Sequence, residues 1–279
     1  MSEKEMKPPF ISVPGVLNFR DIGGYPIASQ SGREVRRGAV YRSAEPSKIT
    51  EAGCERIKGL GIATVYDLRS EQEMANGGQG SPFHARTGAE TVLAPVFRRT
   101  DYSPEAVALR FRTYRAHPEG FAKAYSAILG AAVHPENDAR PYARIMEHLA
   151  MTTDPQPILI HCQAGKDRTA IICALILSLC GVDDDVVAGE YSLSDVGLRS
   201  CHEQLVAKLL EKEEFREDPE SARQMILTPR ENMLLFLREL RREHASVEQG
   251  VINMKLLTAE GIERLKSNMI VDVTDQMIK

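Results

Sequence analysis

The residues at 161–169, "HCQAGKDRT", combine a thiol with several cationic or proton-donating side chains. Cys162 and Arg168 stand in this stretch between the apolar runs 157–160 ("PILI") and 170–180 ("AIICALILSLC"). An apolar run without polar alternation is typical of a buried parallel strand, and one that is apolar all round is typical of a buried helix. We therefore expect a tight strand-to-helix loop. At such a loop, free N–H groups and the helix dipole favour an anion.

The residue types in this loop suit a reaction with a tetrahedral oxyanion. Cys162 supplies a nucleophile, because a helix N-terminus and nearby cations favour the thiolate form of a cysteine. The planar guanidinium of Arg168 matches two oxygens of a phosphate, and Lys166 adds a second cation. Gly165 allows the backbone to turn its N–H groups inward, and Thr169 can donate a hydroxyl hydrogen bond to the thiolate.

The spacing Cys-x5-Arg thus predicts a cradle for a phosphoryl group with a nucleophile at its base. We expect in-line attack of sulfur on phosphorus, a cysteinyl-phosphate intermediate and its hydrolysis by water. The loop N–H groups and Arg168 supply the charge stabilisation, so the reaction needs no metal or other cofactor. The expected substrate-binding residues around Cys162 are Gln163, Ala164, Gly165, Lys166 and Thr169.

The composition of the chain is that of an ordinary globular protein. It has 279 residues, of which 43% are hydrophobic and 27% charged, enough for a core without disulfides. Its net charge of −4 gives no bulk attraction to nucleic acid or acidic membranes. The longest apolar stretch, 170–180, is far shorter than the ~20 residues of a membrane span. We expect no nucleic-acid partner and no transmembrane segment.

The cysteines indicate a reducing compartment. There are five, an odd number, and none form a CxxC pair. The charged stretch 1–10 lacks the apolar core of a secretory signal, so we expect a cytoplasmic protein. The cysteines outside the loop are expected to be small core residues: Cys54, Cys173, Cys180 and Cys201.

The elements that position the loop alternate between strand and helix. Alternating elements predict an α/β fold with a central, mainly parallel sheet flanked by helices, followed by an all-helical C-terminal third. We expect a single domain over 1–279, in which 98–140 is a helical lid, an insertion or an ordinary crossover. Strands are expected at 16–19, 39–42, 63–68, 91–96 and 157–162. Helices are expected at 50–61, 104–115, 119–132, 139–151, 169–180, 184–194, 198–212, 229–243 and 259–269.

Several stretches resemble the cysteine-based protein tyrosine phosphatase superfamily. The loop fits its signature HCxxGxxR[ST], and the closer form HCxAGKDRT is that of the tyrosine phosphatase B-like branch of bacteria and fungi. The resemblance covers most of the chain, is weakest in 98–140, and implies a tyrosine phosphatase-like fold. Further similar stretches occur in the same order: 18–25 ("NFRDIGGY"), 40–50 ("VYRSAEPSKIT"), 64–73 ("TVYDLRSEQE"), 190–195 ("EYSLSD") and 231–251.

The resemblance also implies roles for single residues. Cys162 is similar to the nucleophile of the family, and Arg168 to its phosphate clamp. Asp167 resembles the general acid proposed for this branch, and Lys166 resembles a lysine associated with dual protein and phosphoinositide activity. Some relatives carry an acid where this chain has Phe-Arg at 97–98, and this departure favours Asp167 as the acid.

Other polar residues have a structural or a functional interpretation. His161 is expected to orient the loop by hydrogen bonds. Asp67 and Arg69, at the end of a strand on the same side, form an ion pair or touch the substrate. Arg20 and Asp21 are expected to brace the glycine turn that follows them.

Two further features are weaker alternatives. Asp195 is an alternative acid. Five arginines form either a solvated helix face or a docking patch for an anionic substrate: Arg98, Arg99, Arg110, Arg112 and Arg115.

Three functions are compatible with the loop. The first is a phosphatase acting on phosphotyrosine, with phosphoserine or phosphoinositide as further substrates. The second is a rhodanese-like sulfurtransferase, which also uses a cysteine loop between strand and helix. The third is a phosphate-binding module without catalysis, against which the intact residues of the loop argue. A phosphorylated protein or a phosphoinositide is therefore the expected partner, and the oligomeric state stays open.

Overall fold

A five-stranded sheet lies at the centre of the protein, seen in a computed structural model that describes residues 8–76, 83–98, 101, 109, 110, 112–114, 119–151 and 154–276. Its strand order is β1-β3-β6-β4-β5, in which the last four are mutually parallel and β1 is antiparallel to β3. The expected mainly parallel sheet is thus confirmed. The strands are β1 (Arg20–Asp21), β3 (Val40–Ser43), β6 (Ile158–His161), β4 (Thr64–Asp67) and β5 (Glu90–Leu93).

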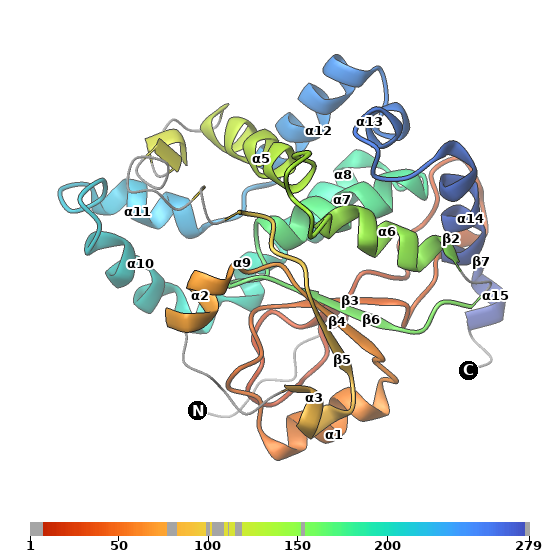
Figure 1. Ribbon diagram of the computed structural model, residues 1–279, viewed down its shortest axis with the longest axis horizontal. Coiled ribbons are helices and arrows are strands. Elements are labelled where there is room, and N and C mark those ends of the chain that lie inside the picture. Colours follow the sequence, from red (N-terminus) through yellow and green to blue (C-terminus); the bar gives the residue numbers. More distant parts are fainter. Residues whose placement is uncertain are drawn as a thin grey trace.

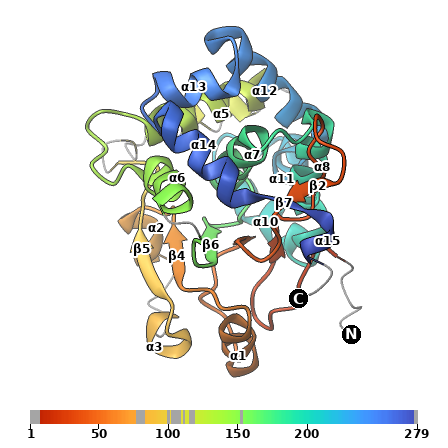
Figure 2. The ribbon, with the colours of Figure 1, turned by 90° about the vertical axis from the view of Figure 1, so that its right-hand side faces the viewer.

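Helices cover both faces of this sheet (Figures 1 and 2). One face carries α1 (Glu51–Gly59) and α3 (Phe83–Thr87). The other carries the larger layer: α5 (Glu119–Ala132), α6 (Pro141–Met151), α7 (Arg168–Leu179), α8 (Asp184–Ser192), α12 (Arg230–His244), α13 (Val247–Asn253) and α14 (Ala259–Met269). No helix in the described part of the chain is long and apolar enough to cross a membrane.

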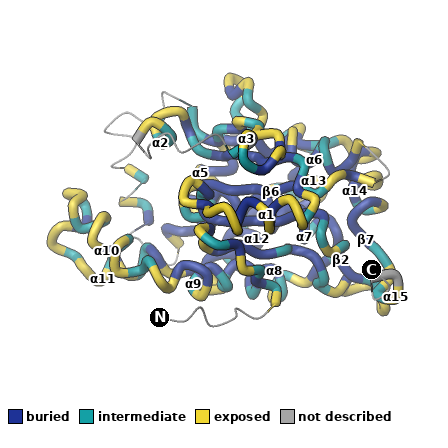
Figure 3. The backbone as a smooth tube through the Cα atoms, turned by 90° about the horizontal axis from the view of Figure 1, so that it is seen from below, coloured by how far each residue is buried: buried dark blue, intermediate teal, exposed yellow. Residues whose placement is uncertain are grey.

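A further group of short helices lies toward one end of the sheet, on the left of Figure 1. It consists of α2 (Glu71–Asn76), α9 (Ser194–Gly197), η2 (Arg199–Cys201), α10 (His202–Leu210) and α11 (Pro219–Ile226). Figure 3 shows many exposed residues in α10 and α11, whereas the strands β3, β4 and β6 at the centre of the sheet are buried throughout. At the opposite end, β2 (Arg33–Val35) and β7 (Ile270–Asp272) form a two-stranded antiparallel sheet, followed by α15 (Val273–Gln276).

Alternate residues of β6 face opposite sides of the sheet. Ile158 and Ile160 belong to the large core cluster that includes α7, whereas Leu159 belongs to the smaller cluster on the side of α1. Cys162, two residues beyond Ile160, is again part of the large cluster. The central strand therefore delivers the thiol to the α7 side of the sheet.

Helix α7 is buried along nearly its whole length. Its residues from Arg168 to Leu177 are all buried, and so is Leu179. Burial on every side is what the sequence 170–180 predicts, since it offers no polar face. A buried strand leading into a buried helix fixes both ends of the short loop between them.

Some elements differ from expectation. The first strand is Arg20–Asp21 rather than 16–19. The C-terminal third is helical as expected except for β7, which pairs with β2. Neither of these two strands was expected, and the same holds for the short helices α2, α3, α9, α11, α13 and α15.

The segment 98–140 contains a core helix. Within α5, eight residues are buried, among them Phe121 and Tyr125. This part of the segment packs as a crossover between β5 and β6 on the α7 face of the sheet. The proposed lid falls mainly on 99–118, where most residues, Arg99 and Arg115 included, lie outside the described residues.

Candidate active site

The loop 162–167 lies at the carboxyl end of the central strand β6, as expected for the ligand site of an α/β fold. Its sharpest turn is at Gly165, which has φ +63°. A Cβ atom there would lie 2.0 Å from the carbonyl oxygen of Ser43 in β3. Glycine is therefore required twice, for the left-handed backbone and for the close approach to β3.

The carbonyl groups of this loop accept hydrogen bonds from residues near β1 and β3. Asn18 Nδ2 donates to the oxygens of Ala164 and Gly165 at 3.1 and 3.3 Å. Arg42 Nη2 donates to the same Gly165 oxygen at 2.6 Å. The oxygen of Gln163 accepts from the backbone N–H of Glu45 at 3.1 Å. These bonds fix the peptide planes of the loop.

Among the described residues, none accepts a hydrogen bond from the N–H groups of Gln163 to Asp167. With their carbonyls turned toward β3 and Asn18, the same peptides present a set of donors at the start of α7. Successive free N–H groups at a helix N-terminus form a binding site for an anion.

Cys162 lies at the base of this loop with only 3% of its surface exposed. Thr169, the first residue after Arg168, is fully buried. Its hydroxyl finds no hydrogen-bond partner among the described residues, the Cys162 sulfur included. The expected hydroxyl–thiolate bond is therefore not formed in this state.

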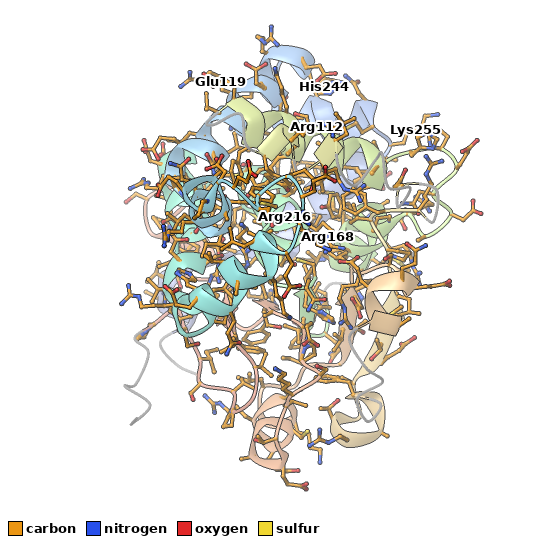
Figure 4. The ribbon with its side chains drawn as sticks, turned by 90° about the vertical axis from the view of Figure 1, so that its left-hand side faces the viewer. Arg112, Glu119, Arg168, Arg216, His244 and Lys255 are labelled. Carbon is orange, nitrogen blue, oxygen red and sulfur yellow. The ribbon has the colours of Figure 1, made fainter. Side chains whose placement is uncertain are left out.

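Arg168 is fixed by an acidic residue that the sequence did not single out. Its Nη1 and Nη2 atoms each lie 2.7 Å from an oxygen of the Glu73 carboxylate, and Nη1 also donates to the Leu68 carbonyl at 3.3 Å. The aromatic ring of Phe97 lies 5.7 Å from the guanidinium. Figure 4, which views the left-hand end of Figure 1, shows Arg168 at the end of the molecule where α10 and α11 lie.

The carboxylate of Asp167 is held by a chain of two tyrosines. The hydroxyl of Tyr125 donates to its Oδ1 at 2.9 Å and lies 2.6 Å from the hydroxyl of Tyr191. Burial first, and then the negative charge of Asp167, raise the pKa of both phenols far above the ordinary range, so both stay neutral donors. Asp167 precedes α7 but makes no side-chain capping bond to it, so its carboxyl stays available.

Lys166 does not lie in the cradle of N–H groups. Its ammonium donates to the Met225 carbonyl at the end of α11 at 2.5 Å and lies 5.8 Å from the centre of the Phe121 ring. The distance from Nζ to Asp167 Oδ1 is 3.8 Å. In this state the second cation of the loop thus connects it to α11.

A histidine and an ion pair support the loop on the β4 side. His161 Nε2 lies 3.7 Å from the carboxylate of Asp67, which Arg69 Nη2 contacts at 2.7 Å. Burial lowers the pKa of His161, so its ring is neutral at pH 7. Burial alone would raise the pKa of Asp67, but its partners hold it below the ordinary value. Since His161 is uncharged, Arg69 provides the compensating charge.

Arg20 and Asp21 have separate roles. Asp21 accepts from the N–H groups of Gly23 and Gly38 at 2.8 and 2.7 Å, so it braces the glycine turn as expected. Arg20 does not. Its side chain is fully buried and its Nε donates to Glu190 Oε1 at 2.7 Å. The expectation for Arg20 was wrong because a turn next to it in sequence says nothing of a partner in α8.

Other candidates lie in structural contacts. Asp195 accepts hydrogen bonds from the backbone N–H and hydroxyl of Thr228, which ties α9 to the start of α12. Arg98 pairs with Glu136 and lies 3.5 Å from Asp101. No group of three or more acidic, histidine or cysteine side chains in the described part of the chain could hold a metal ion.

Comparison with known proteins gives consistent matches. A family model described as "Tyrosine phosphatase family" matches residues 11–271. The triple specificity protein phosphatase PtpB of Mycobacterium tuberculosis is 30% identical over 228 residues, which make up 77% of this chain and 78% of that protein. A tyrosine-protein phosphatase of Nostoc commune is 28% identical over 162 residues, 56% of this chain and 48% of that protein.

Proposed function

Because the chain belongs to the tyrosine phosphatase family, we propose that it hydrolyses phosphotyrosine in proteins through a cysteinyl-phosphate intermediate. One observation carries this proposal: the N–H groups of Gln163 to Asp167, which directly follow Cys162 in the loop, have no acceptor among the described residues. Three equatorial oxygens of a phosphoryl group need such donors in the transition state.

The first step transfers the phosphoryl group to the enzyme. The Cys162 thiolate attacks phosphorus in line with the bond to the leaving oxygen, so that an S–P bond forms as the P–O bond breaks. Arg168 donates two hydrogen bonds to equatorial oxygens. Since Glu73 occupies both Nη atoms in this state, we infer that phosphate binding shifts or shares this contact.

Asp167 is the proposed proton donor and acceptor. It protonates the leaving phenolate oxygen in the first step. In the second step a water molecule gives its proton to the Asp167 carboxylate and attacks phosphorus, the S–P bond breaks, and thiolate and inorganic phosphate result. The bond from Tyr125 to Oδ1 orients the carboxyl and leaves Oδ2 for the substrate.

Phosphoserine and phosphoinositides are further candidate substrates. The relative PtpB is named for triple specificity, and Lys166 in this loop is a cation that a second phosphate could engage. That use requires the ammonium to release the Met225 carbonyl. A sulfurtransferase activity has no support from the family to which the chain belongs.

The test compares the wild type with Cys162→Ser on phosphotyrosyl peptides, phosphoseryl peptides and a soluble phosphoinositide. We expect turnover of phosphotyrosine by the wild type and none by Cys162→Ser, while the variant still binds vanadate or phosphate, because the N–H donors and Arg168 remain. Turnover by the variant would contradict the nucleophile. A wild type without turnover on any substrate would indicate a phosphate-binding module.

A further inference from the structure

Arg20, Arg42 and Glu190 form a buried ionic cluster that contacts the loop through the Gly165 carbonyl. Glu190 of α8 accepts from Arg20 Nε at 2.7 Å through Oε1 and from Arg42 Nη1 at 2.6 Å through Oε2. Both arginines have no exposed surface, and Glu190 has 3%. Two positive charges thus face one negative charge, and one positive charge is left uncompensated within the cluster.

A buried net charge is costly unless an opposite charge lies next to it. The Arg42 guanidinium contacts the loop and keeps one free donor: its Nη2 donates to the Gly165 carbonyl at 2.6 Å, and its Nε has no partner among the described residues. Arg42 pairs in register with Ile160 of β6, so its side chain lies on the α7 side of the sheet, which is also the side of the Cys162 and Cys173 thiols. Either of them, if ionised, could supply the missing negative charge.

Cys173 is not that group. It is fully buried on α7, and burial raises its pKa to about 12, so it is a neutral thiol at physiological pH. Cys162, by contrast, stands at the loop whose N–H donors and helix start already favour an anion. Burial acts to lower the pKa of Arg42, but the Glu190 carboxylate counters this effect, and the pKa lies above its ordinary value.

The other groups around Cys162 supply no competing charge. Burial keeps the phenols of Tyr142 and Tyr114 protonated by raising their pKa, and it keeps His161 neutral by lowering its pKa. The charged residues nearby are paired with partners in the described part of the chain. These pairs are Arg168 with Glu73, Lys166 with Asp167, and Asp67 with Arg69.

We propose that the Cys162 thiolate is the counter-charge of the Arg20–Glu190–Arg42 cluster, so that Arg42 is a positioning residue that stabilises the ionised nucleophile from beneath the loop. The inference rests on the proposed function for the role of Cys162 as nucleophile. It assigns Arg42 a task distinct from that of Arg168, which faces the phosphate. The buried cluster prepares the thiolate before any substrate binds.

The experiment measures the rate at which iodoacetamide alkylates Cys162 as a function of pH, followed by mass spectrometry of the peptide that carries it. Only the thiolate reacts, so the midpoint of the profile reports ionisation, and no turnover is needed. We expect Arg42→Gln to shift the midpoint upward. An upward shift by one pH unit slows alkylation about ten-fold at pH values below both midpoints.

Glu190→Gln is the matched variant of opposite sign. It removes the negative charge of the cluster and leaves both arginines, so we expect its midpoint to shift downward. The double variant Arg42→Gln/Glu190→Gln keeps the net charge of the cluster and should fall between the two. General damage to the loop would instead move all variants in the same direction. Cys173→Ala removes a neutral group and should leave the profile unchanged.

Two outcomes would overturn the proposal. One is an Arg42→Gln midpoint equal to that of the wild type. The other uses the wild type alone, so it applies even if the substitutions prevent folding. Because buried charges are screened only weakly by salt, we expect the wild-type alkylation midpoint to be the same at low and at high ionic strength. A midpoint that rises markedly with salt would place the stabilising cations at the surface. A wild type that shows the expected midpoint shifts in its variants but hydrolyses no phosphorylated substrate would contradict the proposed function alone.

Discussion

At the scale of single residues, the two acidic groups next to the loop have different tasks. Asp167 receives a hydrogen bond from one tyrosine, makes no capping bond, and keeps one oxygen for chemistry. Both carboxylate oxygens of Glu73 accept hydrogen bonds from Arg168. The first arrangement suits a group that exchanges a proton, and the second suits a group that holds another side chain.

Asp167→Asn tests the proton donor. A poor leaving group such as tyrosine needs protonation far more than p-nitrophenol does, and acid catalysis contributes typically 10²–10⁴-fold. We therefore expect the variant to lose about that factor in kcat/KM on phosphotyrosyl peptide but much less on p-nitrophenyl phosphate. The basic limb of the kcat/KM pH profile should flatten, because this limb reports the loss of the proton from the acid. Equal losses on both substrates would mean that Asp167 only shapes the loop.

Glu73→Gln tests the support of Arg168. Without the carboxylate the guanidinium loses its bidentate partner, and misplacement of a clamp costs up to about a hundred-fold in rate. We expect kcat/KM to fall about ten- to a hundred-fold. Because Glu73 acts through Arg168, introducing Glu73→Gln into the Arg168→Lys variant should reduce kcat/KM much less than it does in the wild type. Additive losses in this double-mutant cycle would show that the two residues act separately.

At the scale of elements, the ends of the parallel strands and the helices that follow them bring residues that are distant in sequence close to the loop. The loop itself, its strand and its helix could be predicted, because 157–160 and 170–180 are unusually apolar and the residues between them are not. Glu73 was missed although it lies in a family-like stretch, since its helix α2 has only six residues and no readable periodicity. Tyr125 and Glu190 were missed as well, because nothing local indicates their partners.

The pair of Asp67 and Arg69 at the end of β4 gives a pH-dependent contribution to stability. The pKa of Asp67 is lowered in the folded state. The stabilisation that the Asp67 carboxylate gives the folded state is therefore fully present above its pKa in the unfolded chain, about 4. It is lost as the pH falls through the lower pKa of the folded state. We expect Asp67→Asn to reduce the free energy of unfolding by about 1–3 kcal/mol at pH 7. Urea unfolding at pH 7, 5 and 3.5 should show this difference constant at first and then narrowing, whereas a difference that widens in acid would contradict the assignment.

At the scale of the whole molecule, the active loop and the small sheet β2–β7 lie at opposite ends of the fold (Figure 1). Sequence patterns did not indicate that sheet, because its strands have three residues each and contain charged side chains. Its contribution is structural: Ile270 is buried and pairs in register with Val35.

Ile270→Ala should therefore separate stability from activity. Loss of a buried isoleucine side chain costs about 2–5 kcal/mol, so the melting temperature should fall by several degrees. The kcat/KM of the folded fraction should stay within about two-fold of the wild type, since the loop is remote. Val271→Ala, at a less buried position, is the matched control and should melt closer to the wild type. A loss of kcat/KM that parallels the loss of stability would instead connect this end of the fold with the loop.

The pairing of β2 with β7 also bears on how the protein is made. Val35 and Ile270 are opposite each other in the sheet. At about 5–20 residues per second, the ribosome adds Ile270 roughly ten to fifty seconds after Val35. During that time β2 has an open edge that invites contact with other chains. The nascent protein can close this edge only when synthesis has passed residue 272. A prematurely released chain would therefore carry an exposed strand that chaperones and proteases can recognise.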